Sequence, residues 1–505
     1  MAQDDNKDNT IASLGAIRTV AIIGAGLSGL VSAVHLLRAG IDITVFERAN
    51  YVGGAWKYNP QPDRDPPFPS ERPPTPDWAD MERLQGKGLS VEEAALRFAP
   101  PGPVYANMKS NGNKVAMRTS LSNWPEASGD PLDHSEVLEY LEDISHAVED
   151  RIRFDTRVEA VSKEEDSGHW HITTSKLVTT GPSYKTERKT WRFDAVVVAT
   201  GRYGIPRVPD VPGLSTWKRM FPDRLIHAKQ YRTPTNFRGK RVLIIRAFIS
   251  ALEIAKELTD NGAMVYQSAT DTRLDFRDKT DHQNAVKVAM ATEFVVFAQS
   301  GDDAIPQPLE NGQPIPGHVV LQDGRVLKDI HHVIIATGYL TTYPFLGPVL
   351  EQPFTSLQEA DGKVVITADA RTVHNLHEDI FYILDPTLAF IGVTQFASTF
   401  ALFDFQAQVL AAVFAGRVRL PSQVSMREEQ RRRKSRVLPG TLLNSIFMLD
   451  DIVIRRLLDW VNRDLIAGGF EPLSGPDSEC WDAFREQREG SRSQLGMLQD
   501  NYLSS

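Results

Sequence analysis

The sequence has almost no cysteine, because Cys480 is the only one among 505 residues. A single thiol excludes an internal disulfide, a zinc site built from several cysteines and a redox-active dithiol. The chain also lacks a long uninterrupted apolar run. Its most apolar stretch, residues 389–416, is broken by Gln395, Asp404 and two further glutamines, which predicts a buried helix rather than a membrane span.

The sequence has no excess of positive charge either, since its formal net charge is −9. That balance favours solubility and gives no support to nucleic-acid binding. The short basic run at 427–436 is typical of a solvated helix face. The first ten residues are polar and lack the basic-then-apolar layout of a signal peptide. We therefore expect a cytoplasmic globular protein with no integral membrane segment, and its length predicts two or three domains.

A glycine-rich turn follows a short apolar strand at 20–23. It has the pattern G-x-G-x-x-G, formed by Gly24, Gly26 and Gly29. The first glycine permits a tight turn, the second lets the backbone approach a pyrophosphate, and the third lets the next helix pack closely. Free N–H groups at that helix start face the phosphate charge. A second apolar strand at 42–46 ends at Glu47, which predicts a carboxylate that accepts hydrogen bonds from ribose hydroxyls.

The stretch that follows, "YVGGAWKYN", contains Gly53, Gly54 and Trp56. From here the sequence resembles the flavin-containing monooxygenase family (class B flavoprotein monooxygenases), whose FAD motif continues into G-G-x-W. The resemblance recurs in two A-T-G turns at 199–201 and 336–338, and in the closing segment at 386–422. It implies FAD as the cofactor and no metal. The residues that it assigns to FAD are Gly24, Gly26, Gly29, Glu47, Arg48, Gly54, Trp56, Asn111, Val158, Thr200, Gly201 and Gln406.

Some of these residues also have an ordinary structural interpretation. The resemblance places Asn111 beside the flavin ring, as the catalytic candidate, but an asparagine is often a turn residue. Trp56 is equally compatible with packing, Gln406 with the polar needs of a buried helix, and an A-T-G with a tight exit from a strand.

The family fingerprint F-x-G-x-x-x-H-x-x-x-(Y/F) is present in "FPDRLIHAKQY" as Phe221, His227 and Tyr231, with Asp223 in place of the glycine. The resemblance implies that His227 is structural and links domains. Tyr231 in place of tryptophan indicates the flavin-containing or N-hydroxylating branches rather than the Baeyer–Villiger branch.

A second nucleotide turn of the family, G-x-G-x-S-G for NADPH, is altered. Its glycines align with Arg246, Phe248 and Ala251, whereas Ser250 is kept. Alanine can serve at the third position, but Phe248 fills the space where the backbone approaches a pyrophosphate. We expect Arg246 to require a different backbone path. It is either a cation for an anionic substrate or a surface or ion-paired arginine.

The residue that usually neutralises the NADPH 2'-phosphate is also replaced, by Thr270, with Arg273 nearby. The sequence therefore predicts an impaired NADPH site.

The alternation of strands and helices predicts an α/β fold with two Rossmann-like dinucleotide-binding domains. We expect a discontinuous FAD domain, 16–208 and 329–505, with C-terminal helices, and a smaller NADPH-type domain, 209–328, inserted between its parts. A proline-rich insertion at 59–104 is either a substrate-covering lid or a surface excursion.

Three functions remain open. The first is an FAD-dependent monooxygenase that oxidises a small lipophilic organic molecule, a specialised metabolite, through a flavin hydroperoxide, with molecular oxygen as co-substrate. The second is a flavoenzyme that does not use NADPH, either reduced by its own substrate or redox-neutral. The third is a flavin-binding protein without catalysis, because a fold alone does not settle activity.

Overall fold

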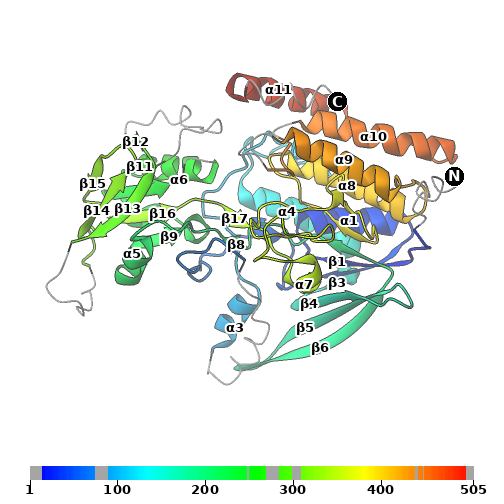
Figure 1. Ribbon diagram of the computed structural model, residues 1–505, viewed down its shortest axis with the longest axis horizontal. Helices are drawn as coiled ribbons and strands as arrows, with labels where there is room; N and C mark the ends of the chain where they lie inside the picture. Colours follow the sequence, from blue (N-terminus) through cyan, green and yellow to red (C-terminus); the bar gives the residue numbers. More distant parts are fainter. Residues whose placement is uncertain are drawn as a thin grey trace, which may run out of the picture.

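The computed structural model describes residues 14–73, 89–246, 249–268, 284–297, 309–437, 442–446 and 449–495, except for the side chains of Thr399 and 490–495. Two lobes are visible in Figure 1: the green strands of the middle of the chain lie apart from the blue, orange and red elements of its two ends.

The larger lobe is built on a seven-stranded sheet whose order is β18-β19-β20-β7-β1-β2-β3. Its strands are β1 Thr19–Ile23, β2 Asp42–Phe46, β3 Ile152–Arg153, β7 Ala195–Val198, β18 Leu376–His377, β19 Phe381–Tyr382 and β20 Leu388–Phe390. The five strands from β20 to β3 are parallel. The central strand β7 is apolar and buried along its whole length, and β1 is so from Val20 to Ile23, because both faces of the sheet are covered.

Helices α1 (Leu27–Arg38) and α8 (Thr399–Phe414) share the main hydrophobic core on one face of this sheet. Helix α8 is buried along nearly its whole length, as its apolar sequence predicts. In the part of the chain that the structure describes, no helix is long and apolar enough to cross a membrane. The other helices of this lobe are α3 Val91–Phe98, α4 His134–Ser145, α7 Gly347–Leu350, α9 Gln423–Arg436, α10 Asp450–Ala467 and α11 Ser478–Leu495.

An antiparallel sheet projects from the larger lobe and consists of β4 Thr156–Lys163, β5 Trp170–Thr180 and β6 Ser183–Phe193. Helix α3 packs on it through Ala94 and Phe98, which share a small buried cluster with Leu177.

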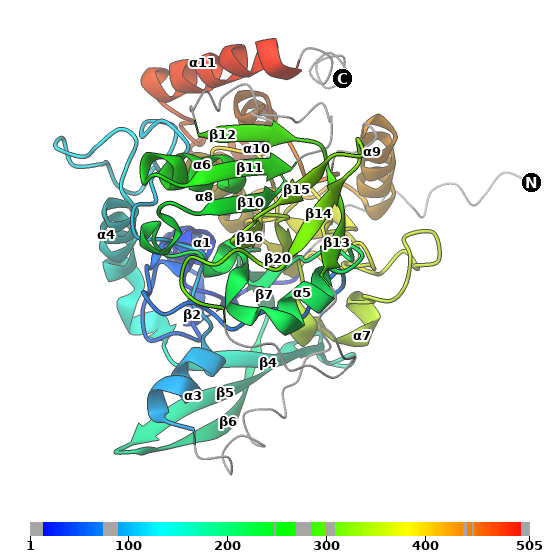
Figure 2. The same cartoon turned by 90° about the vertical axis from the view of Figure 1, so that its left-hand side faces the viewer.

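The smaller lobe has a second parallel sheet, with the order β12-β11-β10-β16-β9, which faces the viewer in Figure 2. Its strands are β9 Leu225–His227, β10 Arg241–Ile245, β11 Met264–Ser268, β12 Ala285–Val288 and β16 His332–Ile335. Helices α5 (Leu214–Met220) and α6 (Ile249–Asp260) belong to this lobe, together with the antiparallel strands β13 Ala291–Val296, β14 Gly317–Leu321 and β15 Val326–Lys328.

The two chain segments that connect the lobes lie side by side. Strand β8 (Ile205–Pro206) follows the first A-T-G turn and pairs antiparallel with β17 (Tyr339–Leu340), which follows the second. One sheet thus takes its strands from both ends of the chain, and the other takes them from 225–335. The prediction of two Rossmann-like units, one inserted into the other, is confirmed, whereas the exact boundaries stay predictions.

Candidate functional site

The first glycine-rich turn connects β1 to α1, and each glycine has a distinct steric reason. Gly24 has a φ of +107°, and a Cβ there would lie 2.6 Å from the carbonyl oxygen of Ala199. A Cβ on Gly29 would lie 1.8 Å from the carbonyl oxygen of Gly24, which enforces close contact between helix and turn. A Cβ on Gly26 would meet only Gly54, at 3.6 Å, so this backbone has open space beside it. The turn therefore has the cradle that a pyrophosphate needs.

Glu47 fixes this cradle from the end of β2. Its buried carboxylate accepts hydrogen bonds from the N–H groups of Ala25 (2.7 Å) and Ala49 (2.9 Å). Burial raises the pKa of Glu47, and these two hydrogen bonds oppose that shift. Both oxygens keep further lone pairs for an acceptor role, so the predicted contact with ribose hydroxyls stays a prediction.

The G-G-x-W element lies directly against the cradle. The Gly53 N–H donates to the carbonyl of Ala25 at 3.0 Å, and Gly54 opens the short 3-10 helix η1 (Gly54–Trp56). The ring of Trp56 packs edge-on against Phe400 of α8, with 6.2 Å between the ring centroids. Trp56 therefore joins the turn to the helix that carries Gln406.

The other residues assigned to FAD occupy varied positions. Arg48, Thr200 and Gly201 are exposed, whereas the side chain of Val158 is buried in β4. Gln406 is buried in α8, where its Nε2 donates to Thr394 Oγ1 at 3.3 Å and its Oε1 has no described partner.

Asn111 is exposed at a loop, and its neighbour Ser110 ties this loop to Leu132 by hydrogen bonds of 2.8 and 3.0 Å. Direct contacts and hydrogen bonds thus bring together one set of the predicted residues: Gly24, Gly26, Gly29, Glu47, Gly54 and Trp56. It gives Asn111 no contact with them.

His227 lies where the two lobes meet. Its Nδ1 accepts from the N–H of Lys229 at 3.1 Å, so Nε2 carries the proton and donates to the carbonyl of Gly338 at 3.1 Å. Burial lowers the pKa of His227 to about 3, which keeps the ring neutral. Of the other two fingerprint residues, Phe221 is buried, and Tyr231 is also buried and donates to Glu257 at 2.7 Å. This geometry suits a structural histidine that joins the inserted sheet to the second A-T-G turn.

The expectation that Arg246 needs a different backbone path is wrong. Its φ is +87°, in the same left-handed region as Gly24, and its N–H donates to Ser268 at the end of β11 (2.7 Å), just as Gly24 donates to Phe46 at the end of β2 (2.8 Å). The parallel pairing of β10 with β11 imposes this path. Arginine lacks the freedom of glycine there, and this conformation costs about 1–2 kcal/mol.

The rest of the altered turn is only partly visible. Ser250 is exposed and Ala251 is fully buried on α6. Phe248, Thr270 and Arg273 lie outside the described residues.

The proline-rich insertion contacts both lobes through its described parts. Asp63 accepts from the ammonium of Lys229 at 2.5 Å, and that ammonium also donates to the carbonyl of Gly204 at 2.7 Å. Lys229 is only 2% exposed. Two residues later, Asp65 pairs with Lys218 at 2.7 Å. Since α3 packs on the projecting sheet, the insertion ties the two lobes together, and its role as a lid stays a prediction.

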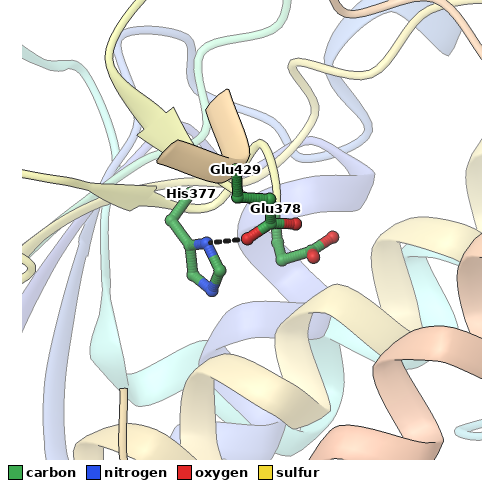
Figure 3. A group of neighbouring side chains, drawn as sticks. All are labelled: His377, Glu378 and Glu429. Atoms are coloured by element: carbon green, nitrogen blue, oxygen red, sulfur yellow. Dashed lines mark ion pairs between the residues drawn. The ribbon is translucent and has the colours of Figure 1, made fainter. Parts of the chain in front are cut away.

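One group of metal-ligand side chains stands out among the described residues: His377, Glu378 and Glu429, at the hairpin of β18 and β19 (Figure 3). Nδ1 of His377 lies 3.1 Å from Oε2 of Glu429, and the guanidinium of Arg456 lies 2.6 Å from Glu378. Burial would raise the pKa of Glu429, but His377 and Arg456 lower it well below its usual range. These are ion pairs that hold α9 and α10 to the hairpin, so we assign no metal to them.

The sequence did not indicate that two further arginines lie around Arg246. Partial burial lowers the pKa of Arg246, and the charges of Arg207 and Arg371 lower it further, so the three charges act on one another. The side chains of Arg246 and Arg371 are nevertheless exposed, and that of Arg207 is half-buried. No local motif marks Arg207 or Arg371, because their proximity depends on the pairing of segments far apart in the sequence.

Comparisons with family models and with known proteins all indicate the same family. The chain matches the model described as flavin-binding monooxygenase-like over residues 101–311 and 316–447, and an NAD(P)-binding Rossmann-like domain over 22–74. It is 35% identical to the flavin-containing monooxygenase ustF2 of Aspergillus flavus, over 94% of this chain and 98% of that protein. It is 28% identical to the flavin-containing monooxygenase iboF of Amanita muscaria, over 83% and 82%.

Solved structures share the fold. The S-allyl-L-cysteine S-oxygenase of Allium sativum superposes with a TM-score of 0.67 at 22% identity, over 96% of this chain and 95% of that one. Tmm of Pelagibacter sp. strain HTCC7211 superposes with a TM-score of 0.63 at 20% identity, over 95% and 91%. The glycine cradle, the open space at Gly26 and the orphaned Oε1 of Gln406 fit a bound FAD. This chain belongs to the flavin-containing monooxygenase family and is an FAD-dependent oxidoreductase.

Proposed function

We propose that this protein is a monooxygenase that oxidises a small lipophilic organic molecule, a specialised metabolite, through a flavin hydroperoxide. The observation that carries the proposal is the intact first turn, where Gly24, Gly26 and Gly29 form a cradle closed by Gly54. Bound FAD would supply the oxygen chemistry. In this proposal the residues of the glycine turn and Gln406 of α8 would hold the cofactor.

Oxidation of a nucleophilic heteroatom is the favoured reaction class. Tyr231 stands where the Baeyer–Villiger branch has tryptophan, and the garlic protein with the similar fold is named as an S-oxygenase of an amino acid. His227 takes no part in proton transfer in this proposal, because its burial and its two hydrogen bonds keep it neutral. Asn111 remains the candidate beside the flavin ring.

The source of electrons is where this chain departs from its family. The second turn keeps the backbone path of the first at Arg246, but it has phenylalanine at the position where the backbone approaches a pyrophosphate. We propose that NADPH binds weakly here. A flavoenzyme reduced by its own substrate, or a redox-neutral one, is therefore the second candidate.

Anaerobic mixing of the FAD-loaded protein with NADPH tests this, with the flavin absorbance as the readout. We expect slow bleaching in the wild type and faster bleaching in the double variant Arg246→Gly, Phe248→Gly. Rapid bleaching of the wild type would remove the NADPH-independent candidate. Conversion of substrate under nitrogen without bleaching would overturn the monooxygenase proposal in favour of redox-neutral chemistry.

A further inference from the structure

Three arginines from distant parts of the chain meet at the junction of the two lobes. Arg246 follows β10, and the N–H of Ala336, just after the neighbouring strand β16, donates to the Ile245 carbonyl at 3.1 Å. Two residues further along, the carbonyl of Gly338 accepts from the N–H of Arg207 at 2.9 Å. Arg207 and Arg246 thus lie at the same carboxyl edge of the inserted sheet.

Arg371 reaches this place from the larger lobe. The N–H of Thr341, which directly follows β17, donates to the Ala370 carbonyl at 2.6 Å, and β17 pairs with β8 beside Arg207. The carbonyl of Arg371 accepts from Gln395, shortly before α8 begins. The arginines therefore stand between the altered nucleotide turn and the segment that leads into the FAD-binding helix.

The positive charge of this cluster is only partly neutralised. Arg207 pairs with Glu71 at 3.2 Å, whose carboxylate is half exposed. Within the described ranges, the guanidinium groups of Arg246 and Arg371 have no ion-pair partner. The nearby Asp369 accepts from the backbone N–H of Arg371. Three guanidinium groups and the two carboxylates of Glu71 and Asp369 leave an excess of one positive charge, which suits one additional anion.

The conformation of Arg246 strengthens this argument. Glycine would adopt its left-handed φ of +87° without strain, yet the chain has the largest cationic side chain there. The side chain of Arg246 is exposed, so solvent screens its repulsion with the other two arginines, but the backbone strain at its positive φ is unfavourable for folding. Arg246 has a function at this position if its guanidinium group binds an anion.

We propose that Arg207, Arg246 and Arg371 bind the carboxylate of the substrate, an inference that rests on the proposed function and narrows its substrate class to lipophilic carboxylic acids. Guanidinium groups present paired N–H donors that match a carboxylate. A phosphate has related chemistry, but the pyrophosphate of a dinucleotide needs a close backbone approach where this chain has Phe248.

Calorimetric titration of the FAD-loaded protein with hexanoate, without NADPH or turnover, tests the proposal. We expect hexanoate to bind and its neutral analogue hexanamide not to bind. Arg246→Gln and Arg371→Gln should each lower the affinity for hexanoate by about tenfold or more, since each removes charge-assisted hydrogen bonds. Arg241→Gln is the matched control, because Arg241 starts the same strand at the opposite edge and pairs with Asp329.

A second measurement separates binding from a structural role. Arg246→Gly should raise the Tm by about 2 °C, because it removes strain and like-charge repulsion, while hexanoate affinity falls. Equal binding of hexanoate and hexanamide, no binding of either, or unchanged affinity in both glutamine variants would overturn the proposal. If NADPH displaces hexanoate, and if both glutamine variants weaken NADPH binding equally, the site would be reassigned to a phosphate group. Flavin reduction is measured separately, so failure here leaves the proposed function standing.

Discussion

The contact between Asp63 and Lys229 should contribute far more to stability than its neighbour between Asp65 and Lys218. Lys229 is 2% exposed, and apart from Asp63 its ammonium has the Gly204 carbonyl as a described partner. Asp63→Asn keeps the shape of the side chain but leaves a buried cation without its counter-charge. Such a loss costs about 3–5 kcal/mol, a large share of the stability of a typical domain.

Asp65→Asn is the matched control, because this carboxylate is 46% exposed in its pair with Lys218. Its loss should cost at most about 1 kcal/mol. Urea unfolding of the two variants and the wild type gives the comparison through the midpoint and slope of each transition. Equal losses in the two variants would refute the assignment of the larger energy to the burial of Lys229.

The pH dependence of Asp63→Asn provides a second check. Burial lowers the pKa of Lys229 below 10.5, and Asp63 opposes that shift. Without Asp63 the folded state binds this proton still more weakly than the unfolded chain does. The variant should therefore regain stability as pH rises toward 10.5. If the difference in the free energy of unfolding between the variant and the wild type stays constant with pH, the Lys229 ammonium is not the cause of the destabilisation.

Three further predictions concern the cofactor cradle and two titratable groups whose pKa values are shifted by burial. Gly29→Ala should abolish FAD retention, because its Cβ would lie 1.8 Å from the Gly24 carbonyl oxygen. Gly15→Ala is the control and should retain FAD, because Gly15 has open space around it. Flavin absorbance after gel filtration measures the FAD that each variant retains. Burial raises the pKa of Glu253 to about 7, so stability should fall as pH rises from 4.5 to 7, and thermal melts of Glu253→Gln should lack this decline. Burial lowers the pKa of His227 to about 3, so stability should fall as pH drops from 6.5 toward 3, and a decline that persists in His227→Gln would contradict this origin.

Local patterns predicted the first strand, turn and helix well, because most of the residues that define this unit are near neighbours in the sequence. The strand, the three glycines and Glu47 fall within residues 20–47, and their spacing alone requires a turn of this shape. The backbone path at Arg246 was predicted wrongly because residue preference was weighed above strand pairing. The register of β10 against β11 fixes the turn, and the arginine adopts a conformation that it disfavours.

Contacts between distant segments were beyond the sequence. Asp63 and Lys229 are 166 residues apart, and nothing local to either marks the pair. Arg371 approaches Arg207 because β8 and β17 pair and because a loop of the larger lobe bonds to Thr341. Such proximity follows from tertiary packing, which a single sequence does not encode as a readable pattern.

The mixed origin of the larger sheet has a consequence for synthesis on the ribosome. Strand β7 is an edge strand until β20, at residues 388–390, has emerged, and α1 lacks its partner α8 until residue 414. The inserted sheet, complete by residue 335, can close earlier. The edge of β7 in the nascent FAD domain therefore stays unpaired until β20 is synthesised, and an exposed strand edge favours aggregation. The larger sheet is therefore completed only after the inserted sheet, although its first strands are synthesised earlier.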